Sequence, residues 1–231
     1  MKDVGILEKN IDVIFKDKDV LNEALTHRSY LNENPKWKLP HNERLEFLGD
    51  AVLELAVTEA LYKEFPSSPE GDLTVYRAAL VNYQTLASVA AGFHLDDFIL
   101  MSRGERMDNS KAKEVILANA IEALIGAIYL DQGYEIAEKF INEKVLVKLP
   151  DILKSKSYKD PKSELQEIVQ DKFKVTPSYR VLEESGPAHK REFKVGVYFK
   201  DETPEAEGSG TSKQEAEAEA AKNALKKISN V

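Results

Sequence analysis

The sequence contains no cysteine, only four histidines and a single tryptophan in 231 residues. Without cysteine, neither a disulfide framework nor a thiolate metal site can form, so oxygen atoms become the main candidates for binding any metal. No apolar run reaches the roughly 18 residues that a membrane-spanning helix needs. The first residues also lack the apolar stretch of a secretory signal. We therefore expect a cytoplasmic protein with no membrane association.

The chain also lacks a basic excess, since its formal net charge is −8. This argues mildly against nucleic-acid binding, which usually leaves a basic footprint. Net charge averages over the whole surface, however. Residues 158–231 carry 13 Lys and Arg against 14 Asp and Glu, whereas residues 1–157 carry 19 against 26. The negative excess therefore lies in the first part, and the nearly neutral second part can still present a basic face.

Helical periodicity dominates the first 150 residues. It predicts helices over residues 21–31, 42–65 and 72–81, with Asp72 as an N-cap, a further helix that follows to about residue 91, and helices over 114–131 and 135–146. Residues 101–113 are polar and aperiodic, which predicts a loop.

Residues 154–160 are again polar and aperiodic, and they predict a linker between one domain at 1–153 and another at 161–231. Beyond the linker, the pattern predicts a helix at 161–173, strands at 178–183 and 191–199, a third strand within 204–209 and a helix at 212–228. The predicted fold class is an all-α domain followed by a small α+β domain of order α-β-β-β-α.

Residues 42–50, NERLEFLGD, place three carboxylates at one-turn spacing on the face of a predicted helix: Glu43, Glu46 and Asp50. Like charges at this spacing repel and destabilise a helix, and a bound cation would reverse that effect. The alternative is a solvated acidic face, which Glu54 would extend.

Asn119 and Glu122 lie three residues apart in the apolar segment 114–131, so they share a helical face. A buried carboxylate must be paired, protonated or bound to metal, and a salt bridge to Arg44 or Arg77 is the alternative to a metal. Two helices that each present such polar pairs resemble a helix-bundle carboxylate site. All-oxygen ligands favour Mg²⁺ or Mn²⁺, for which phosphodiester hydrolysis is the most direct chemistry.

The last predicted helix carries several lysines, with Lys213 near its N-terminus, where free N–H groups and the helix dipole suit a phosphate. An ordinary amphipathic helix with solvated lysines would have the same pattern. The residues alone do not decide between these two interpretations.

Several segments together resemble bacterial ribonuclease III. They are NERLEFLGD at 42–50, ALTHRS at 24–29, EGD at 70–72 followed by RA at 77–78, and ILANAIEALIGAIYL at 116–130. Residues 161–228 are similar to a double-stranded-RNA-binding domain, through LQE at 165–167, GPAH at 186–189 and GSGTS at 208–212.

The resemblance implies a homodimeric, Mg²⁺-dependent endonuclease for double-stranded RNA, with Mn²⁺ as a substitute metal. Each subunit would cut one strand and leave 5′-phosphate and 3′-hydroxyl ends, in ribosomal and messenger RNA processing. Carried over by motif, the roles fall on metal ligands Glu46, Asp50, Asn119 and Glu122, of which Asp50 and Glu122 are catalytic; on cleft residues Glu43 and Glu70; on the dimer contact Phe47; and on RNA contacts Gln166, His189 and Lys213.

Two departures from the family pattern matter. Asn119 stands where the family usually has Asp, which predicts weaker metal affinity, with activity recovered at higher Mg²⁺ or with Mn²⁺. An alternative is a double-stranded-RNA-binding protein with impaired or no cleavage; a structural ribosome-associated protein would be expected to lose the carboxylates. In addition, Lys213-Gln214-Glu215 replaces a more basic cluster, which predicts weak duplex binding with a shallow salt dependence.

Overall fold

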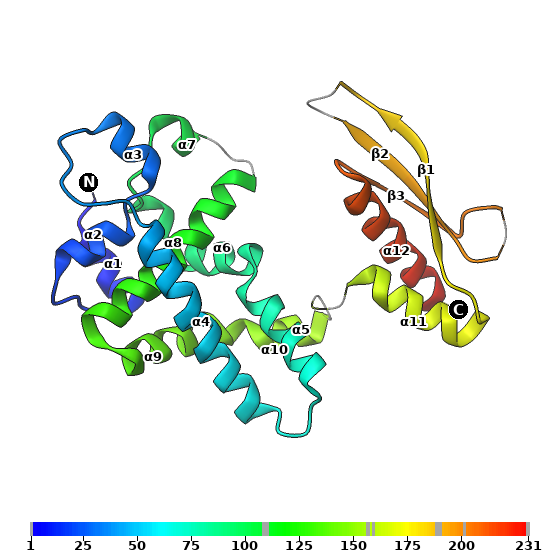
Figure 1. Ribbon diagram of the computed structural model, residues 1–231, viewed down its shortest axis with the longest axis horizontal. Coiled ribbons are helices and arrows are strands. Elements are labelled where there is room, and N and C mark those ends of the chain that lie inside the picture. The colour runs from blue at the N-terminus through cyan, green and yellow to red at the C-terminus, as the bar shows by residue number, and fades with distance from the viewer. Residues whose placement is uncertain are drawn as a thin grey trace. The chain divides into compact units, whose positions relative to one another are not determined.

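The chain divides into two compact units, Met1–Tyr158 and Lys159–Val231 (Figure 1). The computed structural model describes residues 2–107, 111–155, 158, 160–187, 191–200 and 202–229. The helices of the first unit are α1 (Val4–Ile11), α2 (Lys18–Ala24), α3 (Arg28–Glu33), α4 (Glu43–Glu64), α5 (Glu70–Val81), α6 (Tyr83–Gly92), η1 (Leu95–Asp97), α7 (Arg103–Met107), α8 (Lys111–Gln132), α9 (Tyr134–Lys144), η2 (Leu146–Lys148) and α10 (Leu149–Ser155). None of the helices within the described ranges is long and apolar enough to cross a membrane.

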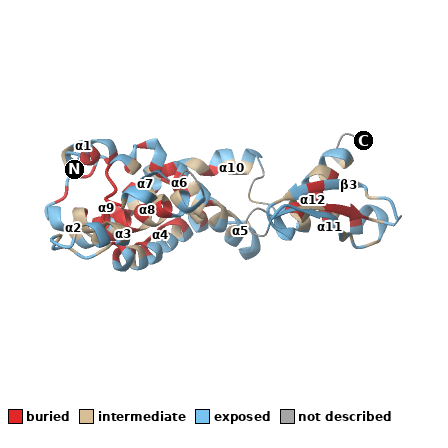
Figure 2. Ribbon diagram, turned by 90° about the horizontal axis from the view of Figure 1, so that it is seen from above, coloured by how far each residue is buried: buried red, intermediate tan, exposed pale blue. Residues whose placement is uncertain are grey.

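The core of the first unit is built around α4 and α8, the two helices with the most extensive mutual packing. Helix α8 is buried almost all round, as its apolar sequence predicts, and Ile121 and Leu124 have no exposed surface. It also packs against α2, α6 and α9. Figure 2 shows the buried residues gathered inside each unit beneath an exposed outer surface. This central position of α8 sets its polar residues against α4.

Three local predictions are wrong. The helix expected over 21–31 is two helices, because Thr26 leaves the helix to form a parallel bridge with Leu100. The loop expected over 101–113 contains α7, whose five residues are too few and too exposed to show an apolar period. Helix α5 begins at Glu70 with Pro69 as its N-cap, so Asp72 lies inside the first turn. An acidic side chain still suits that turn, because it complements the helix dipole.

The second unit consists of α11 (Pro161–Phe173), β1 (Ser178–Ser185), β2 (Glu192–Tyr198), β3 (Ala206–Gly210) and α12 (Lys213–Ser229). The strands form an antiparallel sheet in the order β1-β2-β3. Lys154 and Ser155, which fall in the predicted linker, are the last residues of α10.

Helices α11 and α12 close the core of the second unit, where Leu165, Val197 and Ala220 are completely buried. Helix α12 touches β3 directly, because Gly208 has no side chain. A Cβ atom there would lie 2.1 Å from the backbone nitrogen of Ala220. The glycine thus serves the packing of α12 on the sheet.

Candidate active site

The candidate site begins with a backbone contact between α4 and α8. A Cβ atom on Gly49 would lie 1.7 Å from the carbonyl oxygen of Glu122, and one on Gly126 would lie 2.3 Å from that of Leu45. Any larger residue would push the helices apart. Because Leu45 meets Gly126 while Gly49 meets Glu122, the two helices run in opposite directions at this contact. Neither glycine was singled out from the sequence, although a glycine inside each of two long helices was the available signal.

This contact brings the acidic side chains of the two helices together. Burial, followed by the charges of Asp50 and Glu46, raises the pKa of Glu122 to about 7. Burial also raises the pKa of Glu46, with further contributions from the charges of Glu43 and Asp50. Carboxyl groups shift in this way when negative charges crowd together with little solvent. Three residues of α4 and one of α8 therefore share one electrostatic site.

Asn119 completes this group, because its side chain hydrogen bonds to Glu46 and partly offsets the rise in the Glu46 pKa. The salt-bridge alternative for Glu122 is not what the structure shows. Arg77 donates to Thr58 Oγ1 at 3.0 Å, and Arg44 faces Glu23. Among the described residues, neither arginine forms an ion pair with Glu122.

The donor atoms fit a hard divalent cation. Glu46, Asp50 and Glu122 supply carboxylate oxygens and Asn119 an amide oxygen, which are the ligand types of Mg²⁺ and Mn²⁺. Within the described parts of the chain, no three His, Asp or Glu side chains form a closed ligand group around one point. Mg²⁺ does not require such a cage, since it usually binds one or two carboxylates and keeps waters or substrate phosphate as its other ligands.

Glu43 and Phe47 lie at the edge of this group. Glu43 is about half exposed, and its Oε1 lies 3.4 Å from Arg28 Nη1. Phe47 is 81% exposed although its side chain is a large apolar ring.

Glu70 lies elsewhere in the unit. It begins α5, accepts a hydrogen bond from Thr74 Oγ1 at 2.9 Å and lines a hollow with Thr58 and Tyr62. Thr58 is twelve residues along α4 from Glu46, a rise of about 18 Å at 1.5 Å per residue. Within a single chain, the structure therefore does not bring Glu70 to the other four acidic residues.

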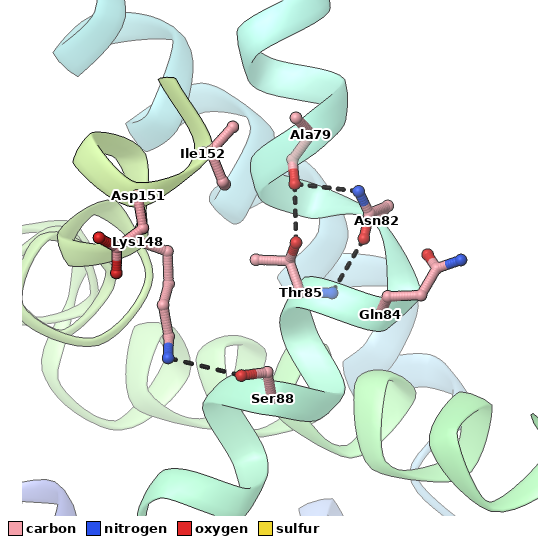
Figure 3. A pocket seen from close by; sticks show the side chains of 8 residues that line it. All are labelled: Ala79, Asn82, Gln84, Thr85, Ser88, Lys148, Asp151 and Ile152. Carbon is pink, nitrogen blue, oxygen red and sulfur yellow. Dashed lines mark hydrogen bonds between the residues drawn. The ribbon is translucent and has the colours of Figure 1, made fainter. Parts of the chain in front are cut away.

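A further hollow of about 430 Å³ lies between the α5–α6 junction and the segment η2–α10 (Figure 3). Asn82 shapes it, accepting from the Thr85 backbone N–H at 2.9 Å and donating to the Ala79 carbonyl at 2.9 Å. Lys148 approaches Ser88 Oγ at 3.4 Å. None of the predicted site residues lines this hollow, and its hydrogen bonds join α5 to α6 and η2 to α6.

In the second unit, the predicted RNA contacts Gln166 and Lys213 are both exposed. Gln166 lies on α11 beside the buried Leu165, and Lys213 is the first residue of α12, with its Nζ 5.8 Å from the centre of the Phe193 ring. His189 lies outside the described residues. Glu215, which the sequence already marked as a departure from the family pattern, accepts through its Oε2 from the Thr211 N–H at 2.9 Å and from Thr211 Oγ1 at 2.6 Å.

Comparison with known proteins decides what this arrangement belongs to. The family model described as Ribonuclease-III-like matches residues 17–149, and that of the Double-stranded RNA binding motif matches residues 161–228. A Ribonuclease 3 from Dehalococcoides mccartyi is 43% identical over 230 residues, which cover 100% of this chain and 97% of that protein. The chain belongs to the ribonuclease III family.

Other members of the ribonuclease III family agree. A Ribonuclease 3 from Oceanobacillus iheyensis is 43% identical, with 99% of each protein covered. The solved nuclease domain of ribonuclease III from Campylobacter jejuni is 45% identical, with a TM-score of 0.58 over 65% of this chain and 98% of that one. The chain is thus a double-stranded-RNA endoribonuclease, consistent with a role in rRNA and mRNA processing. The predicted family, fold class and enzymatic activity are confirmed.

Proposed function

We propose that the endoribonuclease reaction takes place at Glu46, Asp50, Asn119 and Glu122, with Mg²⁺ as the physiological cofactor and Mn²⁺ as a substitute. The observation that carries the proposal is the burial and crowding of these carboxylates. Burial first, and then the charges of Asp50 and Glu46, raise the pKa of Glu122 to about 7. Crowded negative charge in a partly buried site destabilises the fold, and such unfavourable electrostatics are typical of functional sites. A divalent cation would relieve it and would draw the phosphate of the substrate to the same place.

Each residue then has a defined task. Glu46, Asp50, Glu122 and the amide oxygen of Asn119 would hold the metal, which supplies an activated water and stabilises charge on the leaving oxygen. Asp50 and Glu122 orient the attacking water. Because burial and the neighbouring charges raise the pKa of the Glu122 carboxyl to about 7, a cation bound there would displace its proton and favour the carboxylate. The products carry 5′-phosphate and 3′-hydroxyl ends.

Asn119 is the residue on which the alternative function rests. An amide removes one negative charge from the group, so metal affinity falls and binding without cleavage becomes the competing proposal. The four remaining carboxylates at or beside the site favour cleavage. They are Glu43, Glu46, Asp50 and Glu122.

The test is cleavage of a perfect RNA duplex while Mg²⁺ or Mn²⁺ is titrated. We expect wild-type cleavage at a high Mg²⁺ requirement, a lower requirement for Asn119→Asp, and a loss of about 10³-fold in rate for Glu122→Ala. If only Asn119→Asp cleaves at any metal concentration, the chain is the non-cleaving binder. If Glu122→Ala cleaves as the wild type does, the reaction lies elsewhere.

We further propose that the enzyme is a homodimer that pairs through α4. An exposed apolar stripe runs along this helix, with Phe47 81%, Leu55 52% and Tyr62 73% exposed. These residues are seven or eight positions apart, or two turns, so they share one face. Leu55 lies midway between the other two. An antiparallel pairing across a two-fold axis near Leu55 is therefore self-complementary, as an isologous interface requires.

This pairing would place Phe47 of each subunit next to a hollow on the other. The hollow lined by Thr58, Leu61, Tyr62, Leu73 and Arg77 lies at the opposite end of the stripe and has a volume of about 430 Å³. Phe47 of each subunit would insert into that hollow of the other. Glu70 lines the same hollow, so the pairing would carry the Glu70 of one subunit toward the Glu43 and Glu46 of its partner. The cleft role expected for Glu70 would then be fulfilled across the interface.

Sedimentation analysis of Phe47→Ala tests the pairing. We expect the dimer to weaken at least tenfold, because a fully buried phenyl ring contributes roughly 2 kcal/mol or more. Ile14→Ala is the matched control, since Ile14 is 78% exposed but lies outside α4. Equal dissociation constants for the two variants would exclude Phe47 from the interface.

In the second unit, we propose that Gln166, His189 and Lys213 contact the duplex. Gln166 and Lys213 are exposed on α11 and α12, and such domains recognise A-form geometry through minor-groove hydroxyls and phosphates rather than by base sequence.

A further inference from the structure

Arg28 is an exposed arginine at the rim of the acidic site. Its Nη1 lies 3.4 Å from Glu43 Oε1, and the two side chains are 72% and 47% exposed. Glu43 lies three residues before Glu46 in the first turn of α4, so the two side chains share one face of the helix. Only Glu43 therefore separates the guanidinium group from Glu46 of the proposed reaction centre. The positive charge of this group attracts the phosphates of a nucleic-acid backbone.

The backbone leading to Arg28 is held from two sides. The Leu100 N–H donates to the Leu25 carbonyl at 2.7 Å, and the His27 N–H donates to the Leu100 carbonyl at 2.9 Å. On the other side, the Asn42 N–H donates to the Thr26 carbonyl at 2.9 Å. Asn42 immediately precedes α4, so these bonds fix the start of α3 directly to the start of the helix that bears Glu43, Glu46 and Asp50.

The first turn of α3 is fixed as well. His27 is its N-cap, and its Nδ1 accepts from the Ser29 N–H at 3.3 Å and lies 2.8 Å from Ser29 Oγ. Ser29 Oγ also accepts from the Ser102 N–H at 3.0 Å. Arg28 lies between these two anchored residues. Its Cα position relative to the acidic site is thus well defined, although its side chain is mostly solvated.

The guanidinium group of Arg28, in contrast, is held only weakly by its ion pair with Glu43. An ion pair as exposed as Arg28–Glu43 contributes between 0 and about 1 kcal/mol. A phosphate offers a guanidinium group two parallel, charge-assisted hydrogen bonds, which are stronger and more directional. A duplex that enters the site brings its phosphates toward four carboxylates, and a cation on a fixed backbone at the rim would offset part of the repulsion.

We propose that Arg28 exchanges Glu43 for a phosphate of the RNA backbone and so positions the duplex against the catalytic carboxylates. Glu43 holds Arg28 in the free enzyme and competes with the phosphate for it. The proposal deepens the proposed function and rests on it. It assigns Arg28 a role in gripping the substrate, while the chemistry stays with Asp50 and Glu122.

The test measures duplex RNA binding in EDTA, where no cleavage occurs, over a range of KCl concentrations. We expect Arg28→Ala to weaken binding about five- to tenfold and to reduce the slope of log Kd against log [KCl] by about one. Arg28→Lys should be intermediate, because it keeps the charge but loses the two-bond geometry. Glu43→Gln should tighten binding about two- to fivefold, because it releases Arg28. In cleavage assays with Mg²⁺, Arg28→Ala should raise KM with kcat within about twofold.

Lys139→Ala is the matched control. Lys139 pairs with Glu143 at 3.8 Å, and these side chains are 60% and 45% exposed, much like the Arg28–Glu43 pair. If Arg28→Ala binds with the Kd and salt slope of Lys139→Ala, or lowers kcat alone, the assignment of Arg28 is wrong. Weaker RNA binding by Glu43→Gln would show that Glu43 does not compete with the phosphate for Arg28. If the wild-type enzyme cleaves duplex RNA, either of these negative results leaves the proposed function intact. If it cleaves under no metal condition, the proposed function itself is wrong.

Discussion

The two units of this protein use the same packing device but treat charge in opposite ways. In each, a glycine lets a helix backbone touch its neighbour: Gly49 between α4 and α8, and Gly208 between β3 and α12. The nuclease unit uses that contact to crowd carboxylates that repel one another. In the RNA-binding unit, glutamates pair with lysines instead, as in Lys162–Glu217, Lys194–Glu207 and Lys222–Glu219.

The difference shows where function costs stability. Two of these pairs, Lys194–Glu207 and Lys222–Glu219, are substantially exposed and contribute little to folding, and Lys162–Glu217 is partly buried. In all three, a lysine charge offsets the glutamate charge. The acidic group of the first unit raises the free energy of the folded state, and the close α4–α8 packing must hold it in place. Catalytic sites commonly carry such unfavourable electrostatics. We therefore expect substitutions at the α4–α8 contact of the nuclease unit to reduce stability and activity more than substitutions elsewhere.

Breaking the helix contact should give the largest effect. Gly49→Ala places a methyl group 1.7 Å from a backbone oxygen, which no side-chain rotation can relieve. We expect the free energy of unfolding of the nuclease unit to fall by about 3 kcal/mol or more, with cleavage lost because the two halves of the site separate. Urea unfolding and duplex cleavage measure the two effects.

Gly71→Ala is the control for that experiment. Gly71 also lies in a helix, α5, but a Cβ atom there would meet nothing within 4 Å. Its stability should be unchanged or raised by up to about 1 kcal/mol, since alanine favours a helix over glycine. If Gly49→Ala is as stable as Gly71→Ala, the close approach of α4 and α8 does not hold the site together.

The burial of Glu122 among neighbouring charges should also appear as a pH dependence of stability. The pKa of Glu122 rises from 4.5 in the unfolded chain to about 7 in the folded one. Between these values, the folded state binds more protons than the unfolded state, so stability must fall as pH rises through this window and then level off. In EDTA, we expect the free energy of unfolding to be about 1–2 kcal/mol lower at pH 8 than at pH 5 because of Glu122.

Glu122→Gln should flatten that pH dependence and be more stable than the wild type at pH 8, although we expect it to lose cleavage activity. Glu143→Gln, which removes an exposed carboxylate from α9, should leave it unchanged. Added Mg²⁺ should lessen the fall in the wild type. An equal slope in Glu122→Gln and wild type would mean that burial and the neighbouring charges do not raise the pKa of Glu122 in the folded enzyme.

Periodicity was sufficient to predict the helices that build the site. The segment at 114–131, which is apolar almost all round, corresponds to α8, and the long run at 42–65, which ends before Pro66, corresponds to α4. One-turn spacing also grouped Glu46 with Asp50 and Asn119 with Glu122. The sequence could not show how closely the helices approach. That depends on Gly49 and Gly126 facing each other, which is a tertiary relation between residues 77 positions apart.

Short and exposed elements were predicted less well for a related reason. Helix α7 has five residues and none of them is buried, so no apolar period marks it. The break at Thr26 comes from its bridge to Leu100, a contact distant in sequence. The position of Glu70 was also hidden, because a motif match gives a residue's role in an assembly but not the distance along α4 that separates it from Glu46.

The smallest effect expected concerns the charge balance of the RNA-binding unit. The Glu215 carboxylate accepts from the N–H and the hydroxyl of Thr211 at the start of α12, beside the exposed Lys213. A negative charge in the first turn stabilises a helix by about 0.3–1 kcal/mol, but here it also repels an approaching phosphate. Glu215→Gln keeps an oxygen acceptor for the cap and removes the charge.

We therefore expect Glu215→Gln to bind duplex RNA about threefold more tightly and to be slightly less stable. Glu219→Gln is its control, because Glu219 lies one turn further along α12 and pairs with Lys222 at 3.9 Å. Fluorescence anisotropy at several KCl concentrations measures both variants. If the two bind equally tightly, net charge alone sets the affinity. A gain confined to Glu215→Gln would show that this unit neutralises its own binding surface through a local hydrogen bond, whereas the nuclease unit leaves its carboxylates unbalanced for a cation.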